Sequence, residues 1–373
     1  MADTADVVVI GGGVIGCSAA YELAKAGMNV TLLERGTIGC EASAASAGLL
    51  VPLHVIEGGE RNPLFDFYWE SSKLFPDLVA DLESSTGMQL DYDPSGSIRV
   101  ATDEDEEEML RQAFEGWKGV EELSVTWAEA EDLREIEPGL GPEVRCGVVS
   151  EDEQSIHPGR LTESLARAAI ARGARIRTGC PVHGVRHQDG RFESVLTSDG
   201  EVAGGELVIA AGAWSRVVCG WFGLEVPISP VRGQMLSIRP ESRALNRPIF
   251  CPEGGVFPKQ DGTMFVGATI ELVGYDKRNT PEGIGSLLPL IPKLIPGFSG
   301  ATFERCWAGL RPLCEDETPV IGRLTGCEGV TIASGHYKMG IIGNAITART
   351  IRQQIVEGRV DPLAAPFLPD RFA

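Results

Sequence analysis

The chain has 373 residues, and its formal net charge is −20 because 53 acidic residues outnumber 33 basic ones. Its hydrophobic fraction of 43% is enough to bury a core, which excludes wholesale disorder, and its length suggests roughly two domains. The strong negative charge argues against a protein that binds nucleic acid or an anionic membrane surface.

Nine cysteines are scattered along the chain, an odd number without a C-x-x-C pair. This usage is typical of a reduced, cytoplasmic protein rather than of a disulfide framework. Residues 1–6 include no basic residue, and the apolar run that follows stops at three glycines. Because no stretch reaches ~18 uninterrupted apolar residues, the sequence predicts neither a signal peptide nor a membrane span.

The first predicted element is a buried strand at residues 7–10, followed by a glycine-rich turn and a helix that ends near Gly27. The turn has the spacing Gly11-x-Gly13-x-x-Gly16. Its glycines permit, in this order, a tight turn, a close approach of the backbone to a pyrophosphate and close packing of the helix on the sheet. The free N–H groups at the start of the helix would bind the anion.

A second predicted strand at residues 30–33 ends at Glu34, and a segment rich in small residues follows at 36–50. A carboxylate at this position accepts hydrogen bonds from ribose hydroxyls and repels a 2′-phosphate, so the unit predicts a dinucleotide site that disfavours NADP. The small residues would let a flat ring lie against the backbone, or would begin a helix packed on the sheet. The fingerprint alone does not choose between FAD and NAD.

The remaining segments alternate between helices and strands. Residues 62–109 are helix-like, with a return through a strand at 96–101 and an acidic helix start at 103–108. A second βα unit follows, with a helix from Pro158 to Gly173, strands at 174–178 and 206–210, and turns at 189–190 and 199–200. Residues 227–311 predict antiparallel strands that are interrupted by a helix at 284–294.

Eight motifs in chain order resemble the D-amino-acid oxidase/sarcosine oxidase (DAO) superfamily of flavoproteins, and most of all its glycine oxidase branch. They are VVVIGGGVIG at 7–16, ERG at 34–36, SAGL at 46–49, VIAAGAWS at 208–215, PVRGQ at 230–234, WAGLRP at 307–312, DETP at 316–319 with IG at 321–322, and GHYKMGI at 335–341. The resemblance spans nearly the whole chain, and an ordered set of motifs is much more specific than any single one.

The resemblance implies FAD as the cofactor. The implied contacts are Gly11, Gly13 and Gly16 at the turn, Val14, Ile15, Glu34 and Arg35 at the AMP half, Ala42, Ser43, Ala47, Gly48 and Leu49 along the pyrophosphate and flavin, Val182 at the adenine side, Gly212, and His336, Lys338, Met339, Gly340, Ile341 and Ile342 at the flavin. The cysteine that carries covalent flavin in sarcosine oxidases would fall near Leu310, and Cys314 lies four residues away. We therefore predict non-covalent FAD.

The resemblance also implies a fold of the α/β (α+β) class, in which a Rossmann-type FAD-binding domain is interleaved with a substrate domain built on a mixed antiparallel sheet. Cofactor-binding motifs occur at both ends and in the middle of the chain. We therefore expect the FAD-binding domain at 1–85, 148–222 and 312–373, and the substrate domain at 86–147 and 223–311. A homo-oligomer is a further expectation.

Arg311 is the predicted substrate-binding residue, because a planar guanidinium can clamp a carboxylate with two parallel hydrogen bonds. From the residues alone, an ion pair with Glu315 or Asp316 is an equal alternative, and the resemblance favours the ligand role. Lys338 stands where an arginine is common in the family. The four histidines at 54, 157, 183 and 187 are predicted to be structural or exposed.

Two positions depart from the glycine oxidase pattern, since Glu253 and Gly255 stand where related enzymes have histidine and tyrosine. The missing ring at Gly255 predicts space for an N-carboxymethyl amine larger than glycine, whose N-substituent would contact Glu253. Oxidation would release glyoxylate and a primary amine, for instance a β-amino acid in a biosynthetic pathway. Alternatively Phe250 or Phe257 refills the gap, and the substrate is glycine or sarcosine.

The implied reaction is hydride transfer from an amino acid or N-substituted glycine to the flavin, with oxygen as the final acceptor and hydrogen peroxide as a product. It needs no catalytic side chain and no metal ion. The alternatives are sarcosine or D-amino-acid oxidation, a flavin dehydrogenase subunit that passes electrons to a protein partner, a structural FAD-binding module, and an NAD-dependent dehydrogenase.

Overall fold

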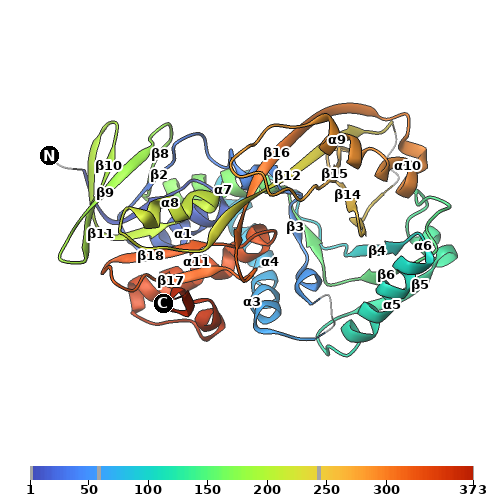
Figure 1. Ribbon diagram of the computed structural model, residues 1–373, viewed down its shortest axis with the longest axis horizontal. Helices are drawn as coiled ribbons and strands as arrows, with labels where there is room; N and C mark the ends of the chain where they lie inside the picture. The colour runs from blue at the N-terminus through green and yellow to red at the C-terminus, as the bar shows by residue number, and fades with distance from the viewer. Residues whose placement is uncertain (1–2, 57–59, 242–244, 373) are drawn as a thin grey trace.

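The computed structural model describes residues 3–56, 60–241 and 245–372, which form two eight-stranded sheets and a small two-stranded one (Figure 1). The first sheet is parallel through its centre, and β17 and the pair β9 and β10 are attached to it as antiparallel strands. Its strand order is β17 (Val320–Arg323), β18 (Val330–Ser334), β11 (Gly200–Ile209), β1 (Asp3–Ile10), β2 (Val30–Leu33) and β8 (Arg175–Arg177), with β10 (Arg191–Thr197) beside β11 and β9 (Val182–Gln188) beside β10.

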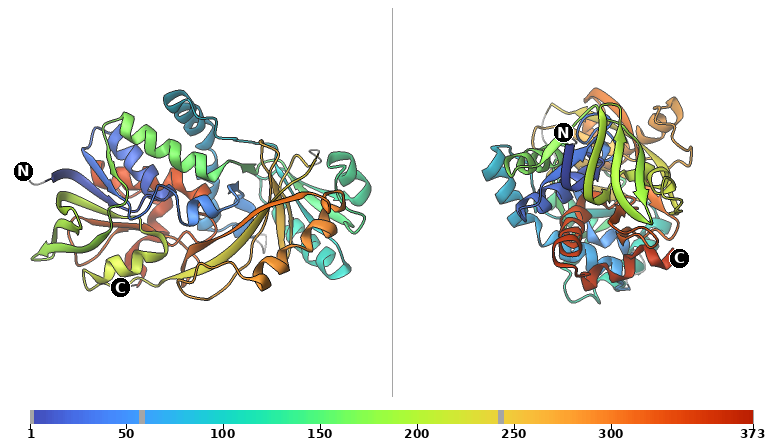
Figure 2. Two further views of the ribbon diagram at one scale, coloured as in Figure 1. Left: turned by 90° about the horizontal axis from the view of Figure 1, so that it is seen from above. Right: turned by 90° about the vertical axis from the view of Figure 1, so that its left-hand side faces the viewer.

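Both faces of this sheet are covered, which explains why β1 is apolar along its length. On one face lie three packed helices, α1 (Val14–Lys25), α7 (Pro158–Ala171) and α11 (Gly340–Glu357) (Figure 2). On the other face, α8 (Ser215–Gly220) and the β9–β10 hairpin complete a second core. Val7 and Val9 enter the first core and Val8 the second, and all three are fully buried.

The second sheet is antiparallel, except that β13 runs parallel to β4. Its order is β16 (Thr302–Cys314), β12 (Ile228–Arg239), β15 (Met264–Gly267), β14 (Gly254–Pro258), β13 (Ile249–Cys251), β4 (Ser97–Ala101), β6 (Cys146–Ser150) and β5 (Val125–Glu129). The helices that pack on it include α5 (Glu104–Trp117), α6 (Ala130–Ile136), α9 (Pro281–Leu287) and α10 (Leu290–Leu294). The two sheets with their helices confirm the predicted α/β fold.

The helix-like stretch predicted at 62–109 is divided into α3 (Pro63–Ser72), α4 (Phe75–Thr86) and α5, with β4 between the last two. Asn62 caps α3 by accepting a hydrogen bond from the Phe65 N–H, and Gly87 ends α4 in the left-handed conformation at φ 70°. The interleaved domain division remains a proposal that the strand membership supports. Strand β6, which contains residue 148, lies wholly in the second sheet.

Two long strands connect the halves of the molecule, since β12 and β16 pair from Ile228 with Cys314 to Arg239 with Thr302 (Figure 1). Cys314 ends this ribbon inside the second core of the first sheet. In the part of the chain that the structure describes, no helix is both long and apolar enough to cross a membrane.

Candidate active site

A cavity of about 730 Å³ lies where the ribbon meets the first sheet. Its walls come from the glycine turn after β1, the segment 41–49 with α2 (Ala42–Ala45), the ends of β11 and β16, and the start of α11. Strands β12, β13, β14 and β15 close the opposite side. The cavity therefore gathers chain segments that are more than 300 residues apart, from Gly11 to Ile341.

The glycine turn at one end of the cavity has room for backbone only. A Cβ atom at Gly16 would lie 1.9 Å from the Gly11 carbonyl oxygen, and Gly11 itself has φ +113°. The helix α1 therefore starts close against the sheet, with Gly13, Val14 and Ile15 on the cavity wall. The Ser43 hydroxyl accepts from the Val14 N–H at 2.9 Å. The start of α1 offers the positive end of a helix dipole, which fits a pyrophosphate.

Glu34 provides the acid of this end of the cavity, and its carboxylate is held by the backbone. Its two oxygens accept from the N–H groups of Gly12 and Gly36, each at 2.7 Å, and the residue is buried. Each oxygen keeps a lone pair for a ribose hydroxyl. Next to it, the Arg35 guanidinium stacks 3.7 Å from the ring centre of Trp214. These features fit the AMP half of FAD.

Most of the residues predicted to contact the cofactor lie on the cavity wall. They are Gly11, Gly13, Val14, Ile15, Glu34, Arg35, Ala42, Ser43, Ala47, Gly48, Leu49, Val182, Gly212, His336, Lys338, Met339, Gly340 and Ile341. Gly16 lies behind the wall, where its contact with Gly11 serves helix packing. Ile342 does not line the cavity, because at this point of α11 its side chain points into the core and is fully buried.

At the other end of the cavity, Met339, Gly340 and Ile341 place the start of the long helix α11 at the wall. His336 precedes them, and burial lowers its pKa to about 3, so the imidazole is neutral. Its Nε2 lies 2.9 Å from the Thr347 hydroxyl, while Nδ1 is buried without a hydrogen-bond partner in the described structure. A helix start beside a neutral ring fits the flavin end of FAD, which gains negative charge on reduction.

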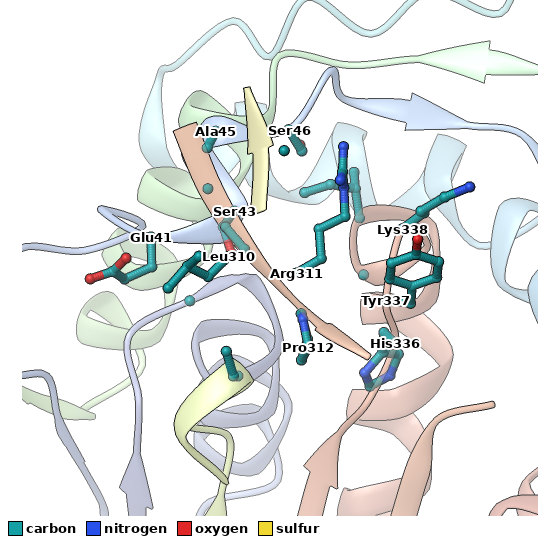
Figure 3. Close-up of a pocket in the computed structure, with 18 of the residues that line it drawn as sticks. Glu41, Ser43, Ala45, Ser46, Leu310, Arg311, Pro312, His336, Tyr337 and Lys338 are labelled. Atoms are coloured by element: carbon teal, nitrogen blue, oxygen red, sulfur yellow. The ribbon is translucent and has the colours of Figure 1, made fainter. Parts of the chain in front are cut away.

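Arg311 lies on β16 and reaches into the cavity from the ribbon (Figure 3). Its guanidinium occupies the space above Gly233 on β12, where a Cβ atom would come within 2.3 Å of it. Nη1 donates to the Thr269 carbonyl at 2.9 Å, and burial lowers the pKa of the guanidinium. Within residues 3–56, 60–241 and 245–372, no carboxylate comes within ion-pair distance of it.

The alternative of an ion pair with Glu315 or Asp316 is wrong for Asp316, whose carboxylate is bound by Arg371 at 2.8 Å. That bond and an Arg371 contact to the Cys314 thiol lie on the far side of the β16 end, away from the cavity wall. The position of the Arg311 side chain is therefore set by the space above Gly233 and by its hydrogen bond to the neutral Thr269 carbonyl. A buried cation with unused donors binds an anion from solution, and a carboxylate matches its planar fork.

Two further residues that were not predicted at the substrate site line the cavity with Arg311. Tyr337 lines the cavity near Arg311 and Lys338 (Figure 3), and its backbone adopts φ 47°. His54, which was predicted to be structural or exposed, also lines the cavity. Burial, and then the charges of Lys338, Arg99 and Arg311, lower the pKa of His54 to about 3. The available signals were that Tyr337 lies inside the motif at 335–341 and that His54 follows the motif at 46–49 by five residues.

The other predicted histidine roles are confirmed. His157 caps α7 by accepting from the Arg160 N–H at 3.2 Å, and His183 and His187 are exposed. Lys338 lies with its Nζ 5.2 Å from the ring centre of Tyr337.

The structure corrects the expectation of empty space at Gly255. Gly255 is not among the cavity-lining residues, and a Cβ atom there would lie 2.7 Å from the Phe257 ring and 2.4 Å from the Ile249 carbonyl oxygen. The Phe257 ring, 5.3 Å from that of Phe250, therefore fills this place. Glu253 does line the cavity, at its exposed edge, and its carboxylate lies 2.6 Å from the Lys293 Nζ.

Comparison with known proteins agrees with this site. Residues 6–354 match the family described as FAD dependent oxidoreductase (DAO). Over its full length the chain is 34% identical to the bifunctional protein ThiO/ThiG of a Synechocystis species, of which it spans about half, 55%. It is 30% identical to the glycine oxidase of Pseudomonas putida over 98% of both chains.

Among solved structures, glycine oxidase from Bacillus cereus superimposes with a TM-score of 0.91 at 32% identity, over 98% of each chain. The glycine turn, the acid after β2, the segment 41–49 and the start of α11 form one cavity of a size and polarity that suit a flavin dinucleotide. This chain therefore belongs to the DAO family of FAD-dependent oxidoreductases.

Proposed function

We propose that this enzyme oxidises the C–N bond of glycine or of an N-substituted glycine whose carboxylate is bound by Arg311. The observation that carries the proposal is the buried Arg311 guanidinium, which faces the cavity and has no carboxylate partner in the described part of the chain. A desolvated guanidinium binds a carboxylate with two charge-assisted hydrogen bonds, and this fixes the orientation of the α-carbon.

The proposed reaction first breaks the C–H bond at the α-carbon. The substrate loses this hydrogen with its electron pair and loses the amine proton, which converts the C–N single bond into an imine. FAD held by the glycine turn, Glu34 and the start of α11 would supply the hydride acceptor, and with oxygen as the final two-electron acceptor the second product would be hydrogen peroxide. Water then adds to the imine and splits it into glyoxylate and an amine.

The residues of this chain contribute orientation and exclusion of water. Arg311 holds the carboxylate, while Met235, Phe250 and Phe257 supply apolar wall on the side of the second sheet. An amine in such surroundings favours its neutral form, because burial disfavours charge. The neutral amine carries the lone pair that assists loss of the hydride.

The filled space at Gly255 supports glycine, or a glycine with a small N-substituent, as the preferred substrate. A second candidate is an N-carboxymethyl amine with a long substituent, which would yield glyoxylate and a primary amine such as a β-amino acid. The turn between β13 and β14 supports this second candidate. Pro252 and Glu253 in this turn line the cavity and are also exposed, so the cavity reaches the surface there. A substituent would leave the cavity along this edge.

The test is an anaerobic screen of the purified holoenzyme, in which loss of the flavin absorbance reports reduction. We expect reduction by glycine and sarcosine, and formation of hydrogen peroxide when air is admitted. Faster reduction by glycines with long N-substituents would select the second candidate. No reduction by any glycine derivative would refute the proposal, and reduction without peroxide would indicate a dehydrogenase that serves a protein partner.

A further inference from the structure

Lys259 is a buried lysine directly behind the wall of the cavity. It follows β14, is only 5% exposed, and its Nζ donates to the Ala47 carbonyl at 2.6 Å. Ala47 lines the cavity, and so do its neighbours Ser46 and Gly48. One hydrogen bond therefore separates this ammonium group from the backbone on which a bound flavin would lie.

The surroundings of Lys259 do little to compensate its charge. Its Nζ lies 5.2 Å from the ring centre of Phe265, which forms an apolar cluster with Met235 and Phe257. None of the described carboxylates forms an ion pair with it. Burial lowers the pKa of Lys259 to about 8, against a weaker opposing effect of acids at greater distance.

The charged groups that face Lys259 from the neighbouring segments are already engaged. Asp91 binds Arg160 at 2.6 Å, Asp261 accepts from the Thr263 N–H at 2.9 Å, and Asp93 accepts from the Ser95 N–H at 2.9 Å. His157 faces it from the start of α7, and the charge of Lys259 helps to lower the pKa of that histidine. A methionine could fill the same apolar volume without the desolvation penalty of a charge.

We propose that Lys259 is a positioning residue that fixes the flavin-binding turn at Ala47 and places a buried positive charge behind it, which favours negative charge in the cavity. The proposal rests on FAD occupying this cavity and not on the identity of the substrate. Two groups benefit from the charge: the reduced flavin, which is anionic, and the substrate carboxylate. In a molecule with a net charge of −20, both enter a field that opposes them.

Lys277, in the loop between β15 and α9, is a matched control. Its Nζ donates to the Cys40 carbonyl at 3.2 Å, so it too holds backbone next to the cavity. It is partly exposed, however, and Glu41 neutralises it at 2.7 Å. A comparison of the two lysines separates a buried, uncompensated charge from a backbone contact alone.

The experiment measures the equilibrium between oxidised and reduced FAD in the holoenzyme against a redox dye, from about pH 6 to about pH 10. In Lys259→Met, we expect this equilibrium to shift about tenfold toward the oxidised form at neutral pH. The wild-type curve should show an additional shift toward oxidised FAD as the pH rises through about 8, where Lys259 loses its proton. The Met variant should lack this step, and Lys277→Met should follow the wild-type curve.

Lys259→Arg keeps its charge throughout this range, so it should match the wild type at neutral pH and show no step. The proposal is overturned if Lys259→Met holds FAD with the wild-type equilibrium, or if the Arg variant behaves like the Met variant. If the Met variant does not retain FAD, a wild-type curve without the step is sufficient to overturn it. Because no substrate is present, failure here is distinguishable from failure of the proposed amine oxidation.

Discussion

The two ends of the cavity are built in different ways. The nucleotide end consists of backbone from one continuous βαβ unit, with a single acid, Glu34, that is held by two backbone N–H groups. The substrate end consists of side chains from strands and turns far apart in the chain, and Arg311, Tyr337 and His54 meet there. Changes at the first end should act on cofactor affinity, and changes at the second on substrate kinetics.

The largest effect is expected from Arg311→Ala. Because two charge-assisted hydrogen bonds to the substrate carboxylate are lost, kcat/KM should fall about a thousandfold, while the visible flavin spectrum stays unchanged. Steady-state kinetics with glycine and an absorbance spectrum measure both quantities. Lys in place of Arg should recover part of the loss, because it restores the charge without the planar fork. Loss of FAD together with activity would assign Arg311 to structure.

Glu34→Gln is the corresponding change at the nucleotide end. The amide presents an N–H₂ group to one of the two backbone N–H donors, so the dissociation constant of FAD should rise about tenfold or more. Fluorescence titration of the apoenzyme with FAD measures it. Once the variant is saturated with FAD, the KM for the amine substrate should equal that of the wild type. A change in KM without a change in FAD affinity would contradict the division between the two ends.

Tyr337→Phe should have a moderate effect at the substrate end. The hydroxyl lies beside Arg311 on the cavity wall, and its removal should raise KM about fivefold with little change in kcat. Tyr275→Phe is the control at the nucleotide end, since the Tyr275 hydroxyl donates to the Ala213 carbonyl at 3.1 Å. Initial-rate kinetics measure KM and kcat for both variants. Equal changes in KM in the two variants would show that Tyr337 does not contribute to substrate binding.

The smallest effect is expected from Glu253→Gln. This carboxylate is half exposed and is bound by Lys293, so solvent screens it and kcat/KM for glycine should change less than about twofold. The same variant assayed with a long, cationic N-substituted glycine sharpens the comparison, because only a substituent that leaves along this edge would reach Glu253. A large loss with glycine itself would place Glu253 inside the substrate site.

The difference between the two ends also explains what could be predicted from the sequence. The glycine spacing and Glu34 belong to one short segment of the chain. Their roles at the nucleotide end could be predicted because backbone sterics alone determine what each glycine permits. Arg311 was predicted from its motif, but the sequence did not show that Asp316 pairs with Arg371, a residue 55 positions further along the chain. An ion pair between residues so far apart in the chain cannot be predicted from the sequence around either residue.

Gly255 shows the limit most clearly. A missing ring in the sequence predicts a hole, yet Phe257 stands two residues later on the same strand, and its ring leans back over the glycine. Whether a hole opens depends on the rotamer of a neighbour, and this is a property of packing rather than of residue type. Tyr337 lies inside the motif at 335–341, but the sequence did not show that its side chain would line the cavity.

Gly233 and Arg311 form a pair with a consequence for how this enzyme and its relatives diverge. The guanidinium occupies the volume that any side chain at position 233 would need. A single substitution at either position should therefore disturb the site. A larger residue at 233 would displace the Arg311 side chain, and a smaller residue at 311 would leave its volume empty. A relative that loses the arginine at position 311 is therefore expected to change position 233 as well. The residues at these two positions should covary across an alignment of the family.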